Sequence, residues 1–571
     1  MSQTRTRLWI MAVGALALAA CASTPRTAYY GTTEPFASEA VYFVLTDRFV
    51  DGDSSNDHRD QGGANRTFDR PLPGANGVMD NIGYLGGDFR GLLDNAEYIR
   101  EMGFTAVWIT PIVDNPDEAF TGGFRVGEGS FADHGKTGYH GYWGVNFYRV
   151  DEHLESPGLS FADFTRRMRA EHSLRIVLDI VCNHGSPSYT MPVDQPGFGE
   201  IYDAKGRLVA DHQNLRPEQL DPANPLHRWF HREPDLAELS NLDDTNPEVM
   251  NYLVGAYLQW IDQGASAFRI DTMGQMPHAF WREFAARIRA AHSGFFMFGE
   301  HFDYDAGKIA ANTWPENGGF SVLDFPGRAR MVEVFENPGS DYARMLDYLH
   351  LEDGVYRNPY ELMTFYDNHD MTRMKASEDG FIDAHNWLFT SRGIPVVYYG
   401  SESAFMAGNR EHEGNRNYFG LQGIAAARES RIRPALSQIA QIRRKSPALQ
   451  RGLQLNLGFG GDRAAFLRVY EKDGVNQTAL VLLNKGGEVA RFAIDRWISA
   501  GTWRDAASGE RIEVKRGGVP PELVVPAHGV RVLLYGAPND DPGLIAELKR
   551  DMSAESAALA RHLAATGGAN H

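Results

Sequence analysis

Short apolar runs alternate with longer stretches of helical spacing along most of this chain. Helical segments fill most of the gaps between them, as at 161–172, 246–262 and 277–290. Strands that alternate with helices form parallel sheets, whose strands are buried on both faces and read as continuous apolar runs. The runs are 41–46, 104–111, 176–181, 267–271, 296–300, 321–325, 363–366 and 395–399. The pattern predicts an α/β fold, a (β/α)8 TIM barrel over residues 36–184 and 241–449.

The alternation of strand-like and helical segments is interrupted once, and beyond residue 449 a different pattern replaces it. Residues 185–240 are rich in Pro, His, Asn and Asp and contain no long periodic segment, which predicts a domain inserted after strand 3. Beyond 449, short strand-like runs separated by Asp-Gly and Gly-Gly pairs predict a C-terminal all-β sandwich over 450–537. Residues 538–571 are expected to form a helical tail with a frayed end.

The first 20 residues have the pattern of an export signal. Arg5 and Arg7 precede an apolar run that is too short to span a bilayer as a mature helix. The run ends in Leu-Ala-Ala-Cys21, which resembles the cleavage box of a bacterial lipoprotein; an ordinary secretory signal cut nearby is the alternative. The resemblance implies a lipid anchor on Cys21 in a bacterial membrane, on the periplasmic side or at the cell surface, with residues 21–35 as a tether.

Net charge and cysteine content bear on two questions, whether the protein binds nucleic acid and whether it contains a disulfide. The formal net charge of −18 argues against nucleic acid as a partner. The chain has 2 cysteines, and since Cys21 is assigned to lipidation, no disulfide with Cys182 is expected.

Acidic side chains follow several of the apolar runs at their carboxyl ends. Asp271, Glu300 and Asp370 each end or follow a different run, and Arg269 shares a strand face with Asp271. The carboxyl ends of barrel strands are where such folds build active sites. Two carboxyl groups in separate roles, one nucleophile and one acid, are what retaining glycoside cleavage requires. Arg269 would keep Asp271 ionised, and the apolar residues before Glu300 would raise its pKa.

Four segments resemble the ordered signature regions of the alpha-amylase family of glycoside hydrolases. They are Asp179 to His184, Phe268 to Asp271, Phe298 to Glu300 and Tyr366 to Asp370. The resemblance implies that Asp271 is the nucleophile, Glu300 the acid/base and Asp370 a stabiliser of the transition state. It also implies contacts to the sugar or its surroundings from Tyr142, His140, His184, His369, Arg269, Asp179 and Arg416.

A calcium site is expected near the N-terminus. Oxygen ligands gathered on a Gly-containing turn suit this cation. The segment resembles the N-terminal calcium site of cyclodextrin glucanotransferases and related amylases, which implies as ligands Asp51, Asp53, Asn56, Asp57, Gly86 and Asp88. The family's other calcium site would use Asn183, with Asn241 in place of the usual aspartate and Gln275 in place of the usual histidine. Gly274 stands where many members carry a substrate-contacting lysine.

The implied function is hydrolysis of α-1,4-glucosidic bonds in starch-derived glucans or maltodextrins through a covalent intermediate. A transglycosylase of the same family is the first alternative, because both reactions share that intermediate. A non-catalytic, lipid-anchored glycan-binding protein is a further alternative. The three intact acids argue against it, since a binding protein has no use for a buried proton donor.

Overall fold

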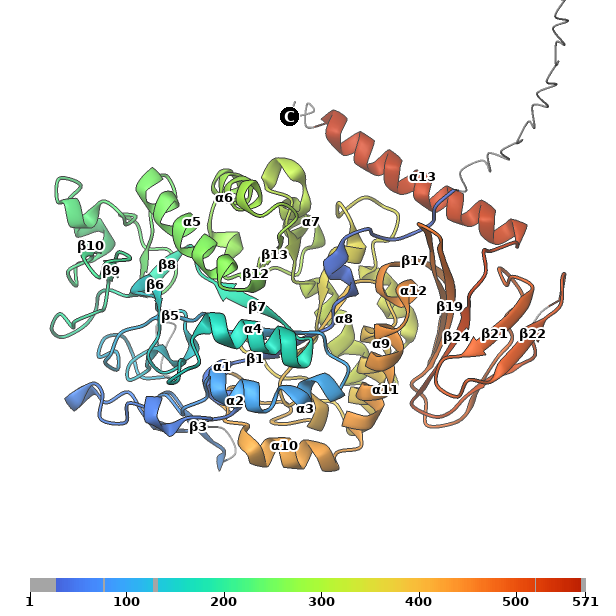
Figure 1. The fold of residues 1–571 in the computed structure, drawn as a ribbon, viewed down its shortest axis with the longest axis horizontal. Coiled ribbons are helices and arrows are strands. Elements are labelled where there is room, and N and C mark those ends of the chain that lie inside the picture. Colours follow the sequence, from blue (N-terminus) through green and yellow to red (C-terminus); the bar gives the residue numbers. More distant parts are fainter. Residues whose placement is uncertain (1–26, 75–76, 127–131, 519, 566–571) are drawn as a thin grey trace, which may run out of the picture.

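The computed structural model describes residues 27–565, except 75–76, 127–131 and 519 (Figure 1). Eight parallel strands form one sheet in the order β14-β13-β12-β7-β4-β1-β16-β15, and a bridge between Leu323 and Met363 joins its two ends. The predicted barrel is therefore confirmed. Its strands are β1 (Val41–Val44), β4 (Ala106–Ile109), β7 (Arg175–Ile180), β12 (Ala265–Ile270), β13 (Phe296–Gly299), β14 (Ser321–Val322), β15 (Met363–Thr364) and β16 (Ile394–Tyr398).

Helices surround the barrel. The predicted helix over 246–262 is α5 (Pro247–Asp262), and Asn246 caps it by accepting a hydrogen bond from the Glu248 backbone N–H. The sequence pattern over 92–102 has helical spacing and predicts one helix, but the structure divides it at Asn95 into two short helices. The other barrel helices are α2 (Phe89–Asp94), α3 (Ala96–Glu101), α4 (Phe161–His172), α6 (His278–Ala291), α7 (Ala306–Ala310), α8 (Phe325–Phe335), α9 (Glu378–Leu388), α10 (Gly420–Glu429), α11 (Ile432–Arg444) and α12 (Pro447–Arg451).

The insertion after β7 is built from two small antiparallel pairs. Strand β8 (His184–Pro187) pairs with β11 (Leu239–Asn241), and β9 (Glu200–Tyr202) pairs with β10 (Leu208–Asp211). Phe198 and Leu239 pack with Trp143 in a separate apolar cluster. This packing fixes the insertion against the loop that follows β4, beside the carboxyl ends of the barrel strands.

The C-terminal part is an antiparallel sheet domain at the opposite end of the molecule from the insertion (Figure 1). Its six-stranded sheet has the order β17-β18-β19-β24-β21-β22, and the β20–β23 pair shares its apolar core. Helix α13 (Pro542–Ala565) buries Leu544 and Leu548 against this core. The strands are β17 (Leu453–Gly460), β18 (Arg463–Lys472), β19 (Val475–Asn484), β20 (Ala490–Phe492), β21 (Gly501–Asp505), β22 (Arg511–Val514), β23 (Leu523–Val525) and β24 (Gly529–Tyr535).

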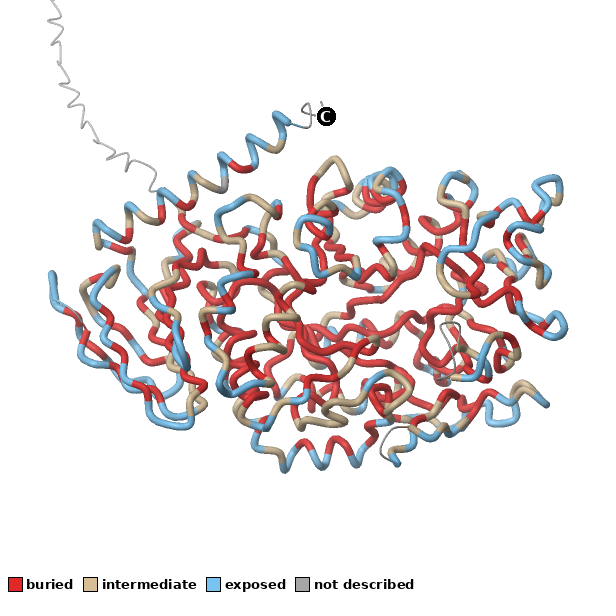
Figure 2. Tube along the Cα trace, turned by 180° about the vertical axis from the view of Figure 1, so that it is seen from behind, coloured by how far each residue is buried: buried red, intermediate tan, exposed pale blue. Residues whose placement is uncertain are grey.

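The sheet domain is locked to the barrel by buried polar contacts. The fully buried Arg468 donates hydrogen bonds to the carbonyl oxygens of Thr390 and Ser391, just beyond α9. Buried residues of the barrel and the sheet domain, including Phe466 and Val481, belong to one apolar cluster (Figure 2). Part of the expected tether also belongs to this region, because Tyr29 is buried and pairs with Glu471 on β18 through two backbone hydrogen bonds.

The expected signal and the lipidation residue Cys21 lie outside the described residues. Within the described part of the chain, no helix combines the length and apolar character needed to cross a bilayer. Cys182 is buried there as a free thiol, as expected for a packing residue.

Candidate active site

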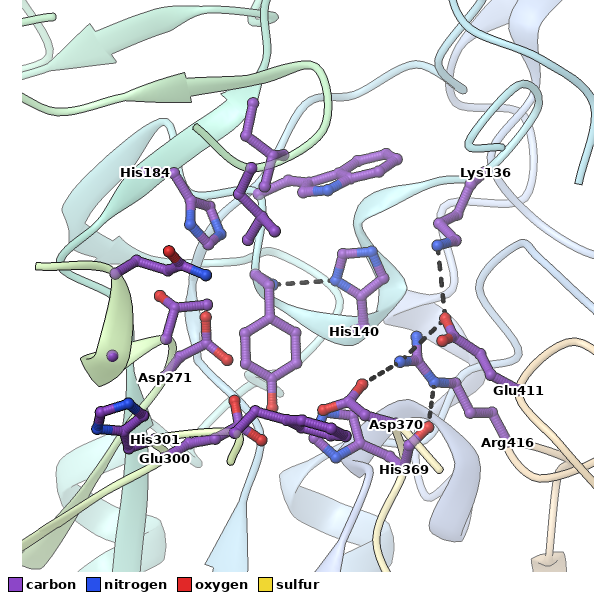
Figure 3. A pocket seen from close by; sticks show the side chains of 18 residues that line it. Lys136, His140, His184, Asp271, Glu300, His301, His369, Asp370, Glu411 and Arg416 are labelled. Atoms are coloured by element: carbon purple, nitrogen blue, oxygen red, sulfur yellow. Dashed lines mark hydrogen bonds and ion pairs between the residues drawn. The ribbon is translucent and has the colours of Figure 1, made fainter. Parts of the chain in front are cut away.

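A cavity of about 460 Å³ lies at the carboxyl ends of the barrel strands (Figure 3). It brings together residues that the sequence distributes over four separate segments and two loops. The proposed site residues that line it are His140, Tyr142, His184, Asp271, Gln275, Glu300, His369, Asp370 and Arg416. Arg269 and Asp179 do not line it; both are buried beneath its floor.

The backbone ladder of the barrel continues through two of the acidic residues. The N–H of Asp271 donates to the carbonyl of Ile180, and the N–H of Glu300 donates to that of Ile270, at 2.9 and 2.8 Å. Glu300 follows Gly299, where an added Cβ would come within 2.1 Å of the Met273 sulfur. A larger residue at position 299 would therefore have to displace the Met273 side chain, which lies just after Asp271.

One guanidinium group joins the two carboxylates from below. Nη1 of Arg269 lies 2.9 Å from Oδ1 of Asp271, and its Nη2 forms an ion pair with Oε2 of Glu300 at 2.8 Å. Nη1 also lies 2.9 Å from Oδ1 of Asp179, whose register partner on β12 is Arg269. Arg269 is fully buried, so these ion pairs are shielded from water. The contact with Glu300 was not part of the sequence prediction.

Glu300 has the environment of a proton donor. Burial raises its pKa to about 8, although the adjacent Arg269 opposes the shift. Its Oε1 is buried and has no hydrogen-bond partner among the described residues, so this oxygen is available to a bound molecule. A carboxyl group that is protonated near neutral pH can act as a general acid.

Asp370 faces the cavity from the segment that follows β15. Nη2 of Arg416 lies 2.6 Å from its Oδ1, and Nε of Arg416 donates to the carbonyl oxygen of His369 at 2.9 Å. Burial raises the pKa of Asp370, while Arg416 opposes this. Arg416 therefore orients both members of the His369–Asp370 pair.

Aromatic and imidazole side chains complete the cavity wall. Tyr142 stacks parallel to His369 with ring centroids 5.3 Å apart, and its hydroxyl donates to Asp179 at 2.8 Å. Burial lowers the pKa of His140, His184 and His369. Neutral imidazoles carry one donor and one acceptor, which suits them to sugar hydroxyl groups.

Sequence reasoning missed several residues that line the cavity. Thr272 and His301 directly follow predicted catalytic residues and Phe302 comes after His301, so their position in the chain could have identified them. Lys136 and Glu411 come from irregular loops and gave no signal.

The expected N-terminal calcium ligands fit a cation. Oδ1 of Asn56 and Oδ1 of Asp57 are buried without a hydrogen-bond partner among the described residues. Gly86 has a φ of +88°, and an added Cβ would lie 2.4 Å from Oδ1 of Asp57 and 3.3 Å from Oδ2 of Asp51. Asp88 ties the site to α2 by accepting hydrogen bonds from Gly91 and Gly52. Asp53 accepts from the N–H of its neighbour Ser55. This set of hard oxygens suits calcium.

If calcium occupies this site, its removal is expected to lower the melting temperature of the protein. A ligand that binds only the folded state stabilises it by about 2.7 kcal/mol at 100 times its Kd. Thermal unfolding with EDTA, and again after calcium is restored, measures the effect. In Gly86→Ala the calcium response should be lost, because the new methyl group would occupy the ligand cradle.

Gly158→Ala provides the matched control. Gly158 has a φ of +76°, and no atom lies within 4 Å of the position that an added methyl group would take. The substitution therefore introduces similar backbone strain without filling a site. Equal calcium responses in the two variants would rule out this site.

The second expected calcium site has a weaker set of ligands. Oδ1 of Asn241 is buried without a partner among the described residues, and Asn183 donates its side-chain N–H to Asp235 at 3.2 Å. Gln275 is exposed at the cavity. The exposed Asp235 is the carboxylate that contacts Asn183, so a cation here would meet less negative charge than at the first site.

Comparisons with known proteins agree with this geometry. The alpha-amylase catalytic-domain family, described as "Alpha amylase, catalytic domain", matches residues 43–433. A cyclomaltodextrin glucanotransferase from Klebsiella oxytoca is 27% identical over 506 residues, covering 79% of this chain and 71% of that protein. An alpha-amylase from Niallia circulans is 27% identical over 519 residues, covering 86% of this chain and 90% of that protein.

Solved structures show the same arrangement. A cyclomaltodextrin glucanotransferase with a three-domain ABC distribution superposes with a TM-score of 0.70 at 28% identity, covering 88% of this chain and 99% of that one. An Anoxybacillus alpha-amylase gives a TM-score of 0.67 at 25% identity, with coverages of 88% and 99%. The family match spans most of the barrel, and this chain belongs to the alpha-amylase family.

Proposed function

We propose that the protein is a retaining glycosidase that cleaves α-1,4-glucosidic bonds in starch-derived glucans or maltodextrins. The observation that carries the proposal is the pairing of Asp271 and Glu300 on one buried Arg269, with Glu300 in the environment of an acid. Retaining enzymes need a nucleophile and an acid/base that lie close together. A single guanidinium that contacts both carboxylates favours this closeness.

In the first step, a carboxylate oxygen of Asp271 attacks the anomeric carbon and displaces the glycosidic oxygen. Glu300 transfers its proton to that oxygen, so the leaving sugar departs as an alcohol. Asp370 and the neutral His184 and His369 bind hydroxyl groups of the same sugar, and Tyr142 provides an aromatic face. In the second step, Glu300 accepts a proton from water as the water oxygen replaces Asp271 on the anomeric carbon.

Calcium is proposed as a structural ion at the Asp51–Asp88 site. When bound there it would tie the loop after β1 to the start of α2, some distance along the chain from the reacting carboxylates. Asn183 and Asn241 would hold a second ion beside the inserted domain.

Export and a lipid anchor at Cys21 are proposed from the sequence of the N-terminus. Production in a bacterial host with radiolabelled palmitate is expected to label the protein, and Cys21→Ser should abolish the label. A soluble, unlabelled wild-type protein would favour an ordinary secretory signal instead.

Transglycosylation is a second candidate for the same site. Phe302, two residues after Glu300, also lines the cavity and is 54% exposed, so we infer that it offers an apolar face on the side where the leaving sugar departs. A sugar held there could replace water as the acceptor. The similarity to cyclomaltodextrin glucanotransferases supports this candidate as well.

Products from maltoheptaose distinguish these outcomes. Proton NMR during the first minutes should show new reducing ends in the α configuration, followed by slow mutarotation. Shorter maltooligosaccharides would support hydrolysis, whereas longer or cyclic products would support transglycosylation. Initial β-anomers would contradict a retaining mechanism, and absence of turnover would contradict the proposed activity.

A further inference from the structure

The two ends of the active-site cavity have different walls. Beside Glu300, the wall is made by His301 and the exposed Phe302. Lys136, Glu411 and Arg416 line the opposite end, beyond Asp370 (Figure 3). We call these three residues the charged barrier.

Ion pairs connect the charged barrier across two loops. Oε1 of Glu411 lies 3.0 Å from Nη2 of Arg416 and 3.6 Å from Nζ of Lys136. Nζ of Lys136 lies 2.7 Å from Oδ1 of Asp133, and Nη2 of Arg416 lies 2.6 Å from Oδ1 of Asp370. Lys136 precedes the His140–Trp143 segment, whereas Glu411 and Arg416 follow β16. The barrier therefore joins the two loops at this end of the cavity.

Burial and ion pairing hold the side chains of the charged barrier in place. Lys136 and Arg416 are only 7% and 5% exposed. Separating buried charges from their partners leaves each one uncompensated in a poorly hydrated setting, which is strongly unfavourable. Arg416 is further fixed by its hydrogen bond to the carbonyl oxygen of His369. These side chains could move aside only by breaking these contacts.

The chemistry of the site tells which end is closed. Glu300 protonates the leaving oxygen, so the leaving part of the chain extends past Glu300 towards His301 and Phe302. The attacked sugar lies over Asp271, between Tyr142 and Asp370. Any sugars on its non-reducing side must therefore extend towards the charged barrier.

We propose that the charged barrier closes the donor side of the site, so that the enzyme acts on maltodextrins from their non-reducing ends. Each turnover would release or transfer a short unit of one or two glucose residues. This inference rests on the proposed glycosidase function and specifies its mode of attack. An open groove, by contrast, would allow cleavage at internal bonds.

The test compares two maltoheptaosides that carry a 4-nitrophenyl group at the reducing end. One has a free non-reducing end, and the other has that end blocked with a 4,6-ethylidene group. The blocked substrate should be cleaved with a kcat/KM at least about tenfold lower, because the added group does not fit a closed subsite. Chromatography of the free substrate should first show labelled products shortened by one or two glucose units.

Variants of the barrier test its cause. Glu411→Ala and the more conservative Lys136→Met should raise the ratio of kcat/KM on the blocked substrate to kcat/KM on the free substrate. Their first products should include those of cleavage at internal bonds. The ratio is informative even if overall activity or stability falls. Arg207→Ala is the matched control, since it removes an exposed ion pair with Asp203 in the inserted domain and should leave the ratio unchanged.

Each result has a definite meaning. Equal cleavage of both substrates by the wild-type protein, with labelled products of intermediate length, would overturn the barrier while leaving the proposed function intact. An unchanged ratio in both barrier variants would also overturn it. If neither substrate were cleaved, the proposed function would fail, and the inference with it.

Discussion

Asp271→Asn is expected to lower kcat/KM on maltoheptaose by roughly 10⁴-fold or more, the scale seen when a nucleophile is removed. The amide cannot form the covalent bond to the anomeric carbon, although it has nearly the same shape as the carboxylate. Steady-state kinetics measure the loss. A substrate with fluoride at the anomeric carbon, α-maltosyl fluoride, should not restore turnover, because its departure still requires a nucleophile.

Asp262→Asn is a suitable control for Asp271→Asn. Asp262 is exposed at the end of α5, where its Oδ1 lies 3.3 Å from Nε2 of His292. This variant should retain wild-type kinetics. Substantial activity in Asp271→Asn, together with unchanged product configuration, would exclude Asp271 as the nucleophile.

Glu300→Gln is expected to lose roughly 10²–10⁴-fold in kcat on maltoheptaose, the usual contribution of a general acid. With α-maltosyl fluoride, the first step should be largely spared, because fluoride leaves without protonation. Burst kinetics on this substrate separate the two steps. An equal loss in the rate of the first step on both substrates would argue that Glu300 is not the acid.

The pH profile provides an independent check on Glu300. The pKa of this carboxyl group is raised to about 8 by burial, and the acid must be protonated to act. Activity should therefore be retained below that pH and fall as pH rises through it. The fall should disappear from the residual activity of Glu300→Gln. A wild-type profile that declines already between pH 5 and 6 would contradict the assignment.

The barrel and its carboxylates could be predicted because both leave a local signal. Each barrel strand is a short apolar run, and Asp271 and Glu300 stand at the ends of two of them. Position on a strand also placed Arg269 on the face of Asp271. What the sequence could not supply was the register between β12 and β13, which lets Arg269 reach Glu300 as well.

Residues in irregular loops escaped prediction for a different reason. Lys136 and Glu411 lie far apart in the chain, in segments with neither helical nor strand periodicity. Their meeting depends on how two long loops pack over the barrel. The split of the helix at Asn95 has a local cause, since the Asn95 side chain donates to the carbonyl oxygen of Gly91 and ends the first helix there.

If Cys21 carries the proposed lipid, the docking of Tyr29 on β18 limits how far the enzyme can stand from a bilayer. With a lipid on Cys21, the chain between the anchor and Tyr29 spans eight residue steps, which reach at most roughly 28 Å when fully extended. Tyr29 pairs with the sheet domain, which lies at the opposite end of the molecule from the inserted domain, so the anchor would attach the enzyme near its sheet-domain end. Anchoring would therefore confine the enzyme to a thin layer of solution next to the bilayer, no farther out than this stretch of chain allows.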